Sequence, residues 1–124
     1  MAIGQLRSVA LDCADPGPLA AFWAEVVGGK LVFQQDDFTV VQAGGLYLVA
    51  TRVAGYRPPS WPEDAVPKQI HLDVAVADLD AAETAAVALG ARRVAHQPAP
   101  DRWRVLLDPS GHPFCLSTQI PEPR

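Results

Sequence analysis

The side chains with the widest chemical range in this chain are three histidines and two cysteines. Cys13 and Cys115 stand far apart, in neither a CxxC spacing nor the dense pattern of a disulfide framework, so both are predicted to be reduced thiols. His96 has no evident partner, and His112 follows a glycine in a predicted turn, where we expect it to be solvated. His71 differs from both because it stands at the start of a repeated segment. The common catalytic motifs GxGxxG, HExxH, GxSxG and the P-loop do not occur.

The repeat consists of two similar segments. RSVALD at residues 7–12 and IHLDVA at residues 70–75 each lead through an aspartate into an alanine-rich stretch that ends at a glycine. The second segment carries His71 where the first carries Ser8. The spacing between matched positions shifts by a residue or two at the turns, so the repeat is structural rather than a recent copy of the sequence.

Composition limits the class of protein. A length of 124 residues, of which 49% are hydrophobic and 19% charged, suits one compact domain with one core. A net charge of -4 with scattered arginines argues against a nucleic-acid partner. No apolar run approaches the roughly 20 residues of a membrane span, and the first seven residues lack the apolar centre of a signal peptide. We therefore expect a single domain over residues 1–124, in a soluble cytoplasmic protein that binds neither nucleic acid nor membrane.

Periodicity indicates the elements that must position these side chains. Residues 6–14 alternate between apolar and polar, as in a half-buried strand. Asp15 offers a carboxylate N-cap and Pro16 a suitable first residue for a helix that ends at the glycine pair 28–29. The three strands predicted next lie at 31–34, 38–43 and 46–52. The first module, over about residues 5–52, is therefore a strand, a helix and three strands.

A proline-rich connection follows at about residues 53–67, where neither a helix interior nor a central strand is expected. The same order then repeats over about residues 68–120. The elements predicted there are a strand at 70–77, a helix between Asp78 and Gly90, and strands at 92–97, 103–108 and 114–119. The sequence thus predicts an α+β fold of two tandem βαβββ modules.

Three short stretches make this pattern resemble a known superfamily: LDCADP at 11–16, AFW at 21–23 and DPSGHPFC at 108–115. With the paired modules, they are similar to glyoxalase-like domain proteins of the vicinal oxygen chelate superfamily, which includes bleomycin resistance proteins and extradiol dioxygenases. The resemblance covers nearly the whole chain. It implies a cup-like, curved eight-stranded sheet with helices on the convex face and a small-molecule cavity on the concave face. It also implies a homodimer, with modules paired within or between chains.

Metal-dependent members of that superfamily hold a divalent cation with one residue near the start of each module's first strand and one near the start of its last strand. By the resemblance, these positions are Ser8, Leu48, His71 and Cys115. Of the superfamily's usual ligands only His71 remains, since leucine has no donor atom, serine is a weak neutral ligand and cysteine stands where a glutamate is usual. A Cys115–His71 pair could hold zinc if waters or a partner chain completed the shell, but two protein ligands would bind it loosely. We therefore expect no bound metal and no cofactor, with a divalent metal ion on His71 as the alternative.

His71 and Cys115 are also the candidate catalytic residues. If the resemblance holds, both begin strands on the concave face, where a thiol near an imidazole can be deprotonated to a nucleophile. The competing interpretation makes Cys115 a small apolar filler and His71 a polar lining group that bonds to Asp73 or a neighbouring strand. We favour the second interpretation, because cysteine is among the most often buried residues.

Two tryptophans are further candidates for ligand contact. Trp61 lies in the proline-rich connection with no element of its own to pack on, so it either closes the mouth of a cavity or docks on a second subunit. Trp103 begins a strand and either lines the cup or shields a hairpin. The predicted ligand-binding residues are Ser8, Leu48, Trp61, His71, Trp103 and Cys115.

These features predict a protein that binds a small organic ligand, without a metal and without transforming the ligand. The alternative is a metal-dependent lyase, isomerase or dioxygenase of the vicinal oxygen chelate type, with His71 as base or ligand and Cys115 as ligand or nucleophile. Leu48 distinguishes the binding protein from the metal-dependent enzyme. An enzyme that needs the usual chelate should not tolerate a leucine at this position, whereas a binding protein does not need a metal ligand there.

Overall fold

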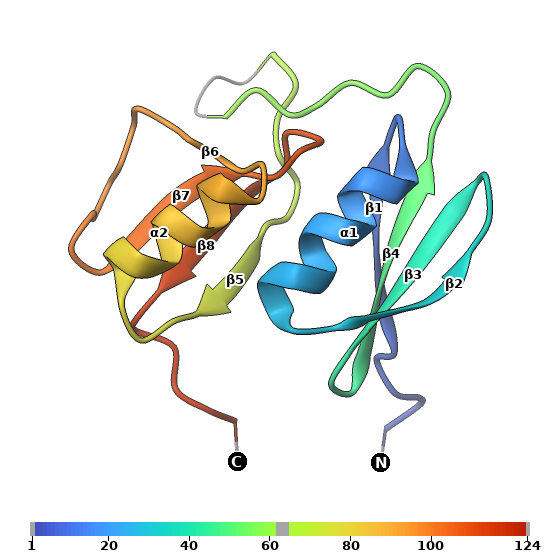
Figure 1. Ribbon diagram of the computed structural model, residues 1–124, viewed down its shortest axis with the longest axis horizontal. Coiled ribbons are helices and arrows are strands. Elements are labelled where there is room, and N and C mark those ends of the chain that lie inside the picture. The colour runs from blue at the N-terminus through green and yellow to red at the C-terminus, as the bar shows by residue number, and fades with distance from the viewer. Residues whose placement is uncertain (1, 62–64, 124) are drawn as a thin grey trace. The chain divides into compact units, whose positions relative to one another are not determined.

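The computed structural model describes residues 2–61 and 65–123 and divides into two compact units, the first ending at Arg57 and the second beginning at Pro58 (Figure 1). Each unit contains one helix and one four-stranded sheet. The order βαβββ occurs in both units, which confirms the predicted α+β fold of two modules. The eight strands are divided equally between the two sheets.

The first unit forms its sheet in the order β1-β4-β3-β2, with β1 parallel to β4 and the other pairs antiparallel. Its elements are β1 (Ser8–Cys13), α1 (Pro16–Val27), β2 (Lys30–Gln34), β3 (Phe38–Ala43) and β4 (Leu46–Arg52). Helix α1 packs on one face of this sheet (Figure 1). Buried side chains of that layer include Leu11, Leu19, Phe22, Trp23 and Val41. The sequence alternation in β1 therefore marks the face that α1 covers.

The two helices begin differently, although an aspartate occupies the N-cap of each. Asp78 accepts a hydrogen bond from the Ala81 N–H at 3.0 Å, three residues into the helix. Asp15 accepts no capping hydrogen bond from α1, all of which lies in the described part of the chain. The equivalent third helical residue of α1 is Pro18, which has no N–H to donate. The predicted carboxylate cap is therefore wrong for Asp15 and confirmed for Asp78.

The second unit repeats the arrangement with shorter strands. Its elements are β5 (Leu72–Ala75), α2 (Leu79–Ala88), β6 (Arg92–Arg93), β7 (Trp103–Leu107) and β8 (Pro113–Ser117). The sheet order is β5-β8-β7-β6, with β5 parallel to β8. Phe114 and Leu106 are completely buried and Leu116 is nearly so, which makes β7 and β8 the centre of this unit's core.

Two strand predictions in the second unit need correction. Strand β6 has two residues, fewer than predicted, because the Gln97 side chain replaces further main-chain pairing with β7. Its Nε2 donates to the carbonyls of Val94 and Val105, each at 2.8 Å, and its Oε1 accepts from the Val105 N–H at 2.9 Å. Strand β5 begins at Leu72, so His71 precedes the strand instead of lying within it.

The turn between β7 and β8 is organised by Asp108, which is 1% exposed. One carboxylate oxygen, Oδ1, accepts hydrogen bonds from the N–H groups of Ser110 and His112. The other, Oδ2, lies 2.8 Å from Nδ1 of His112, whose side chain is only 18% exposed. The expectation that His112 is solvated is therefore wrong, because this carboxylate holds the ring against the turn.

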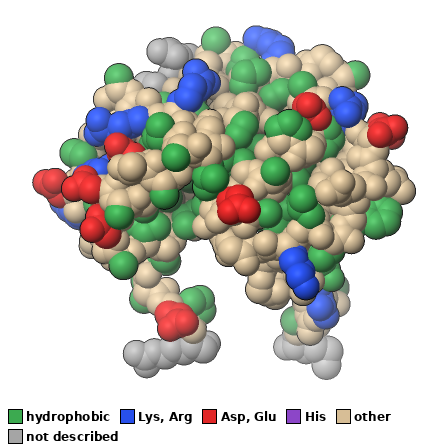
Figure 2. Space-filling model, in the orientation of Figure 1, with side chains coloured by type: hydrophobic (Ala, Val, Ile, Leu, Met, Phe, Trp, Pro, Cys, Tyr) green, Lys and Arg blue, Asp and Glu red, His purple; other side chains and the backbone are tan. Residues whose placement is uncertain are grey.

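The surface carries charges of both signs. On the face shown in Figure 2, lysine and arginine side chains are scattered among aspartates and glutamates. At α2, for example, Arg104 pairs with Asp80 at 2.6 Å and Arg93 pairs with Glu83 at 3.2 Å. Among the described residues, no helix combines the length and the apolar character that crossing a bilayer requires.

Gly29, where the chain leaves α1, lies directly against β3. A Cβ atom there would stand 2.6 Å from the Gln42 carbonyl oxygen and 2.8 Å from Cγ1 of Val41. We expect Gly29→Ala to lower the free energy of unfolding by about 1–3 kcal/mol, because the backbone of β3 must shift to admit the methyl group. Urea unfolding followed by tryptophan fluorescence measures this change.

Gly45, between β3 and β4, supplies the control. Apart from its chain neighbours, no heavy atom lies within 4 Å of a Cβ added there and its φ is not positive, so Gly45→Ala should change the unfolding free energy by no more than about 1 kcal/mol. Equal unfolding free energies for the wild type and Gly29→Ala would contradict the close approach of Gly29 to β3.

Candidate functional site

The second unit contains a cavity of about 360 Å³, which is within the range of small-molecule sites. One part of its wall is apolar or aromatic and consists of Trp61, Pro98, Trp103, Val105, Pro113, Phe114 and Ile120. The other part is polar and consists of Lys68, His71, Asp73, Cys115 and Ser117. A large apolar wall with a few convergent polar groups is typical of a ligand-binding site.

Strand register explains why these side chains share one wall. Asp73 of β5 is paired with Cys115 of β8, which is paired in turn with Val105 of β7. Trp103 is paired with Ser117 in the next row on the same face. Since successive side chains of a strand point to opposite faces, these residues line the cavity while Leu106 and Leu116 between them enter the core.

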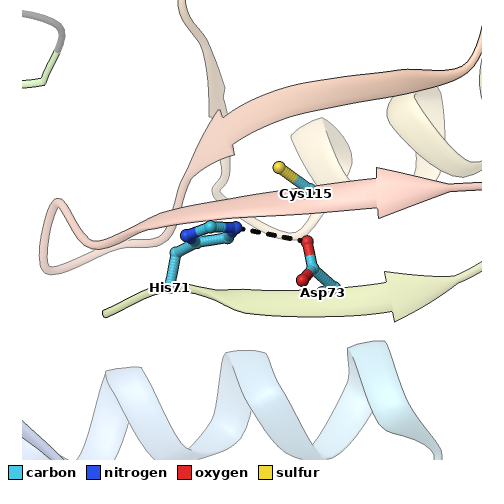
Figure 3. Close-up of side chains that lie close together, drawn as sticks. All are labelled: His71, Asp73 and Cys115. Carbon is cyan, nitrogen blue, oxygen red and sulfur yellow. Dashed lines mark ion pairs between the residues drawn. The ribbon is translucent and has the colours of Figure 1, made fainter. Parts of the chain in front are cut away.

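Three of the polar side chains converge (Figure 3). Nε2 of His71 lies 3.4 Å from Oδ1 of Asp73, and the two side chains are 37% and 48% exposed. One ligand atom from each of His71, Asp73 and Cys115 can be chosen such that all three lie within 4.8 Å of one another. The structure thus places a nitrogen, an oxygen and a sulfur donor around one point, and all three come from the second unit.

The thiol of Cys115 is stabilised in its protonated form. Burial, the charge of Asp73 and a hydrogen bond to that carboxylate together raise its pKa to about 11, while Lys68 acts in the opposite direction. A thiol in this state contains very little thiolate at neutral pH and is a poor nucleophile. Of the two interpretations of Cys115, this environment favours the lining group over the activated nucleophile.

Trp61 lies at the cavity wall, one of the two positions that the sequence left open for it. Nζ of Lys68 is 5.4 Å from the centroid of its indole ring, within the range of a cation–π contact. The His96 ring packs on it at a centroid distance of 5.5 Å, so the expectation that this histidine has no partner is wrong. Trp103 also lines the cavity, and the Arg102 guanidinium lies 6.0 Å from its ring centroid.

Two predicted ligand-binding residues belong to the first unit, Ser8 and Leu48. Ser8 is exposed at the start of β1. Leu48 is paired with Val9, is 8% exposed and lies on the face that α1 covers. The mapping of Leu48 onto the same face as Ser8 is therefore wrong by one residue, because adjacent residues of a strand face opposite sides. On the face of Ser8, Tyr47 is paired with Ser8 itself and Val49 is paired with Ala10, which makes Val49 the counterpart of Cys115.

The structure brings together Trp61, His71, Trp103 and Cys115, and it adds Lys68 and Asp73, which the sequence did not single out as site residues. The sequence pattern could have identified Asp73 as a site residue, because it follows His71 by two residues and such residues share a face in a strand. No signal marked Lys68, because it lies in the irregular segment before β5, where periodicity carries no information.

We expect Asp73→Asn to lower the pKa of the Cys115 thiol, because the negative charge that opposes thiolate formation is removed. Iodoacetamide alkylation at a series of pH values with EDTA present, read by peptide mass spectrometry, distinguishes Cys115 from Cys13. The wild type should show an apparent pKa of about 11 and the variant a lower one. Asp101→Asn, outside the cavity, should behave as the wild type. Identical profiles for the wild type and Asp73→Asn would contradict the described contact.

Comparison with known proteins agrees with this fold. No curated protein matches the sequence. The fosfomycin resistance protein FosX from Mesorhizobium loti is similar in structure, with a TM-score of 0.70, 16% identity and coverage of 97% of this chain and 94% of that chain. The bleomycin-binding protein from Streptomyces verticillus, solved with copper(II)-bleomycin, has a TM-score of 0.60, 18% identity and coverage of 97% and 100%.

A glyoxalase/bleomycin resistance protein/dioxygenase family enzyme from Burkholderia phytofirmans is similar as well, with a TM-score of 0.69, 20% identity and coverage of 91% of this chain and 97% of that chain. At these identities, the structural likenesses establish the fold alone. The family profile described as glyoxalase-like domain matches residues 8–117, which include both βαβββ units. The chain therefore belongs to the glyoxalase-like domain family and has the vicinal oxygen chelate fold.

Proposed function

We propose that this protein binds a small organic ligand in the cavity of the second unit. The observation that carries the proposal is the convergence of two tryptophans and several polar side chains on one space of about 360 Å³. Trp61 and Trp103 provide flat apolar surfaces on which a planar ligand can stack. Lys68, Ser117 and the His71–Asp73 pair provide hydrogen-bonding groups that orient it.

The chemistry of the wall favours a ligand with an aromatic or other planar part and at least one polar group. Lys68 is the one lysine or arginine among the described residues that line the cavity, and it lies beside the Trp61 ring. A stacked ring on Trp61 therefore brings its substituents near the ammonium group. A carboxylate or another electron-rich substituent at that place gains a charge-assisted hydrogen bond.

The metal-dependent chemistry of the superfamily does not suit this chain. The strand pairings of the two units can be compared position by position. The first-unit counterparts of His71, Asp73 and Cys115 are Ser8, Ala10 and Val49. Of the first three, only the serine has a side-chain donor atom. A lyase, isomerase or dioxygenase that takes metal ligands from both modules lacks those of the first module here, so we base the proposed binding on the cavity walls and on no metal-dependent step.

We also propose that the protein is a homodimer. The edge strand β2 exposes three consecutive apolar side chains, Leu31, Val32 and Phe33, at 40%, 43% and 47% of their surface. An exposed apolar edge strand is a surface that proteins usually cover. A second copy of this chain is the occupant that the family resemblance favours.

Ligand binding can be tested with a panel that contains fosfomycin, metal-free bleomycin and small aromatic acids and amines, with tryptophan fluorescence and calorimetry as readouts. For the tightest binder, Trp103→Ala should weaken affinity about tenfold, because a stacking contact contributes about 1–1.5 kcal/mol. Tyr47→Ala removes an exposed aromatic side chain outside the cavity and should leave affinity unchanged.

The proposal would be wrong if a ligand binds saturably and its affinity is unchanged in both Trp103→Ala and Trp61→Ala. A panel with no saturable binder at millimolar concentration would count equally against it. Circular dichroism of each variant separates loss of binding from loss of fold.

A further inference from the structure

The cluster of His71, Asp73 and Cys115 has the composition and spacing of a metal site. Ligands of a tetrahedral zinc ion lie roughly 2.0–2.3 Å from the metal, which puts them roughly 3.3–3.8 Å from one another. The 3.4 Å between Nε2 of His71 and Oδ1 of Asp73 already equals such a spacing. The chosen ligand atoms of all three residues lie within 4.8 Å, so changes in side-chain torsions alone can close the remaining distances.

The backbone holds these donors in place. Asp73 and Cys115 are directly paired across the parallel strands β5 and β8, so their side chains leave the same row of the sheet. His71 precedes Asp73 by two residues, and Figure 3 shows its imidazole directed toward the carboxylate. Asp73 and His71 are half-exposed toward the cavity, which gives an ion a path of entry from solvent.

The donor types select the ion. A thiolate and an imidazole favour zinc and other thiophilic metals, whereas magnesium, calcium and manganese prefer oxygen ligands. Three protein ligands leave one position of a tetrahedral zinc ion open, as in catalytic zinc sites. That position faces the cavity, because the cavity wall contains all three residues.

We propose that His71, Asp73 and Cys115 form a zinc site contained entirely within the second unit. The site differs from the chelate of the superfamily in three respects: it takes no ligand from the first unit, it includes Asp73 and it uses a thiolate. On binding, a sulfur–zinc bond replaces the S–H bond of Cys115, and the proton passes to solvent. The inference goes beyond ligand binding by the cavity and does not depend on it.

Cobalt(II) and zinc titrations of the purified full-length protein, stripped with EDTA, test the site. We expect one equivalent of either ion by elemental analysis, and for cobalt a thiolate-to-metal charge-transfer absorption in the near ultraviolet. Cys115→Ser should abolish that absorption, and Asp73→Asn should keep it while weakening affinity at least tenfold. Manganese(II) should compete poorly with zinc.

Two matched controls locate the site. Ser8→Ala removes the one donor of the first unit at a superfamily ligand position and should leave affinity unchanged, as should His96→Gln, which alters a histidine outside the cluster. A loss of affinity in Ser8→Ala would overturn confinement to the second unit. Substoichiometric metal, a cobalt spectrum without the charge-transfer absorption, or retention of that absorption in Cys115→Ser would overturn the site itself.

The affinity of the best panel ligand, measured with EDTA present, separates this inference from the proposed function. Ligand binding that persists in EDTA while no metal is retained would reject the zinc site alone. Stoichiometric zinc without any ligand binding would reject the proposed function alone.

Discussion

The parallel pairing of the first and last strand of each unit is the constraint on which the site depends. In the second unit it sets Asp73 opposite Cys115 and directs Leu116 into the core. A shift of β8 by one residue would turn the Cys115 thiol into the core and the Leu116 side chain toward the cavity face. Burial of Phe114, Leu116 and Leu106, all at most 2% exposed, strongly disfavours that exchange. The apolar core thus specifies where the polar wall lies.

The same frame carries different chemistry in the two units. The first unit pairs Ala10 with Val49 where the second pairs Asp73 with Cys115. Both pairs lie on the face opposite the helix, so the difference resides in the side chains and not in the backbone. A repeated βαβββ framework therefore tolerates donors in one copy and apolar side chains in the other, because neither set is needed to hold the helix against the sheet.

Local polar contacts explain where the second unit departs from a regular sheet. Gln97 bonds to both the N–H and the carbonyl of Val105, which satisfies main-chain groups that a longer β6 would have paired. Asp108 satisfies two N–H groups of the turn before β8 and holds His112 beside them. These side chains let an irregular backbone approach the cavity without leaving its polar groups unsatisfied.

The sequence by itself determined the order of elements, the two modules and most of the core, because alternating and helical periodicity, glycines and prolines act locally. Periodicity also marked His71 and Asp73 as neighbours on one face, although not as joint ligands. Only the tertiary structure decided that Cys115 is paired with Asp73, that Val49 and not Leu48 shares the face of Ser8, and that Trp61 and Lys68 reach the same cavity. These facts depend on strand register and on the path of an irregular segment, which arise from contacts between residues far apart in the chain. Such contacts are set by the packing of the whole unit, and no local pattern of residues encodes them.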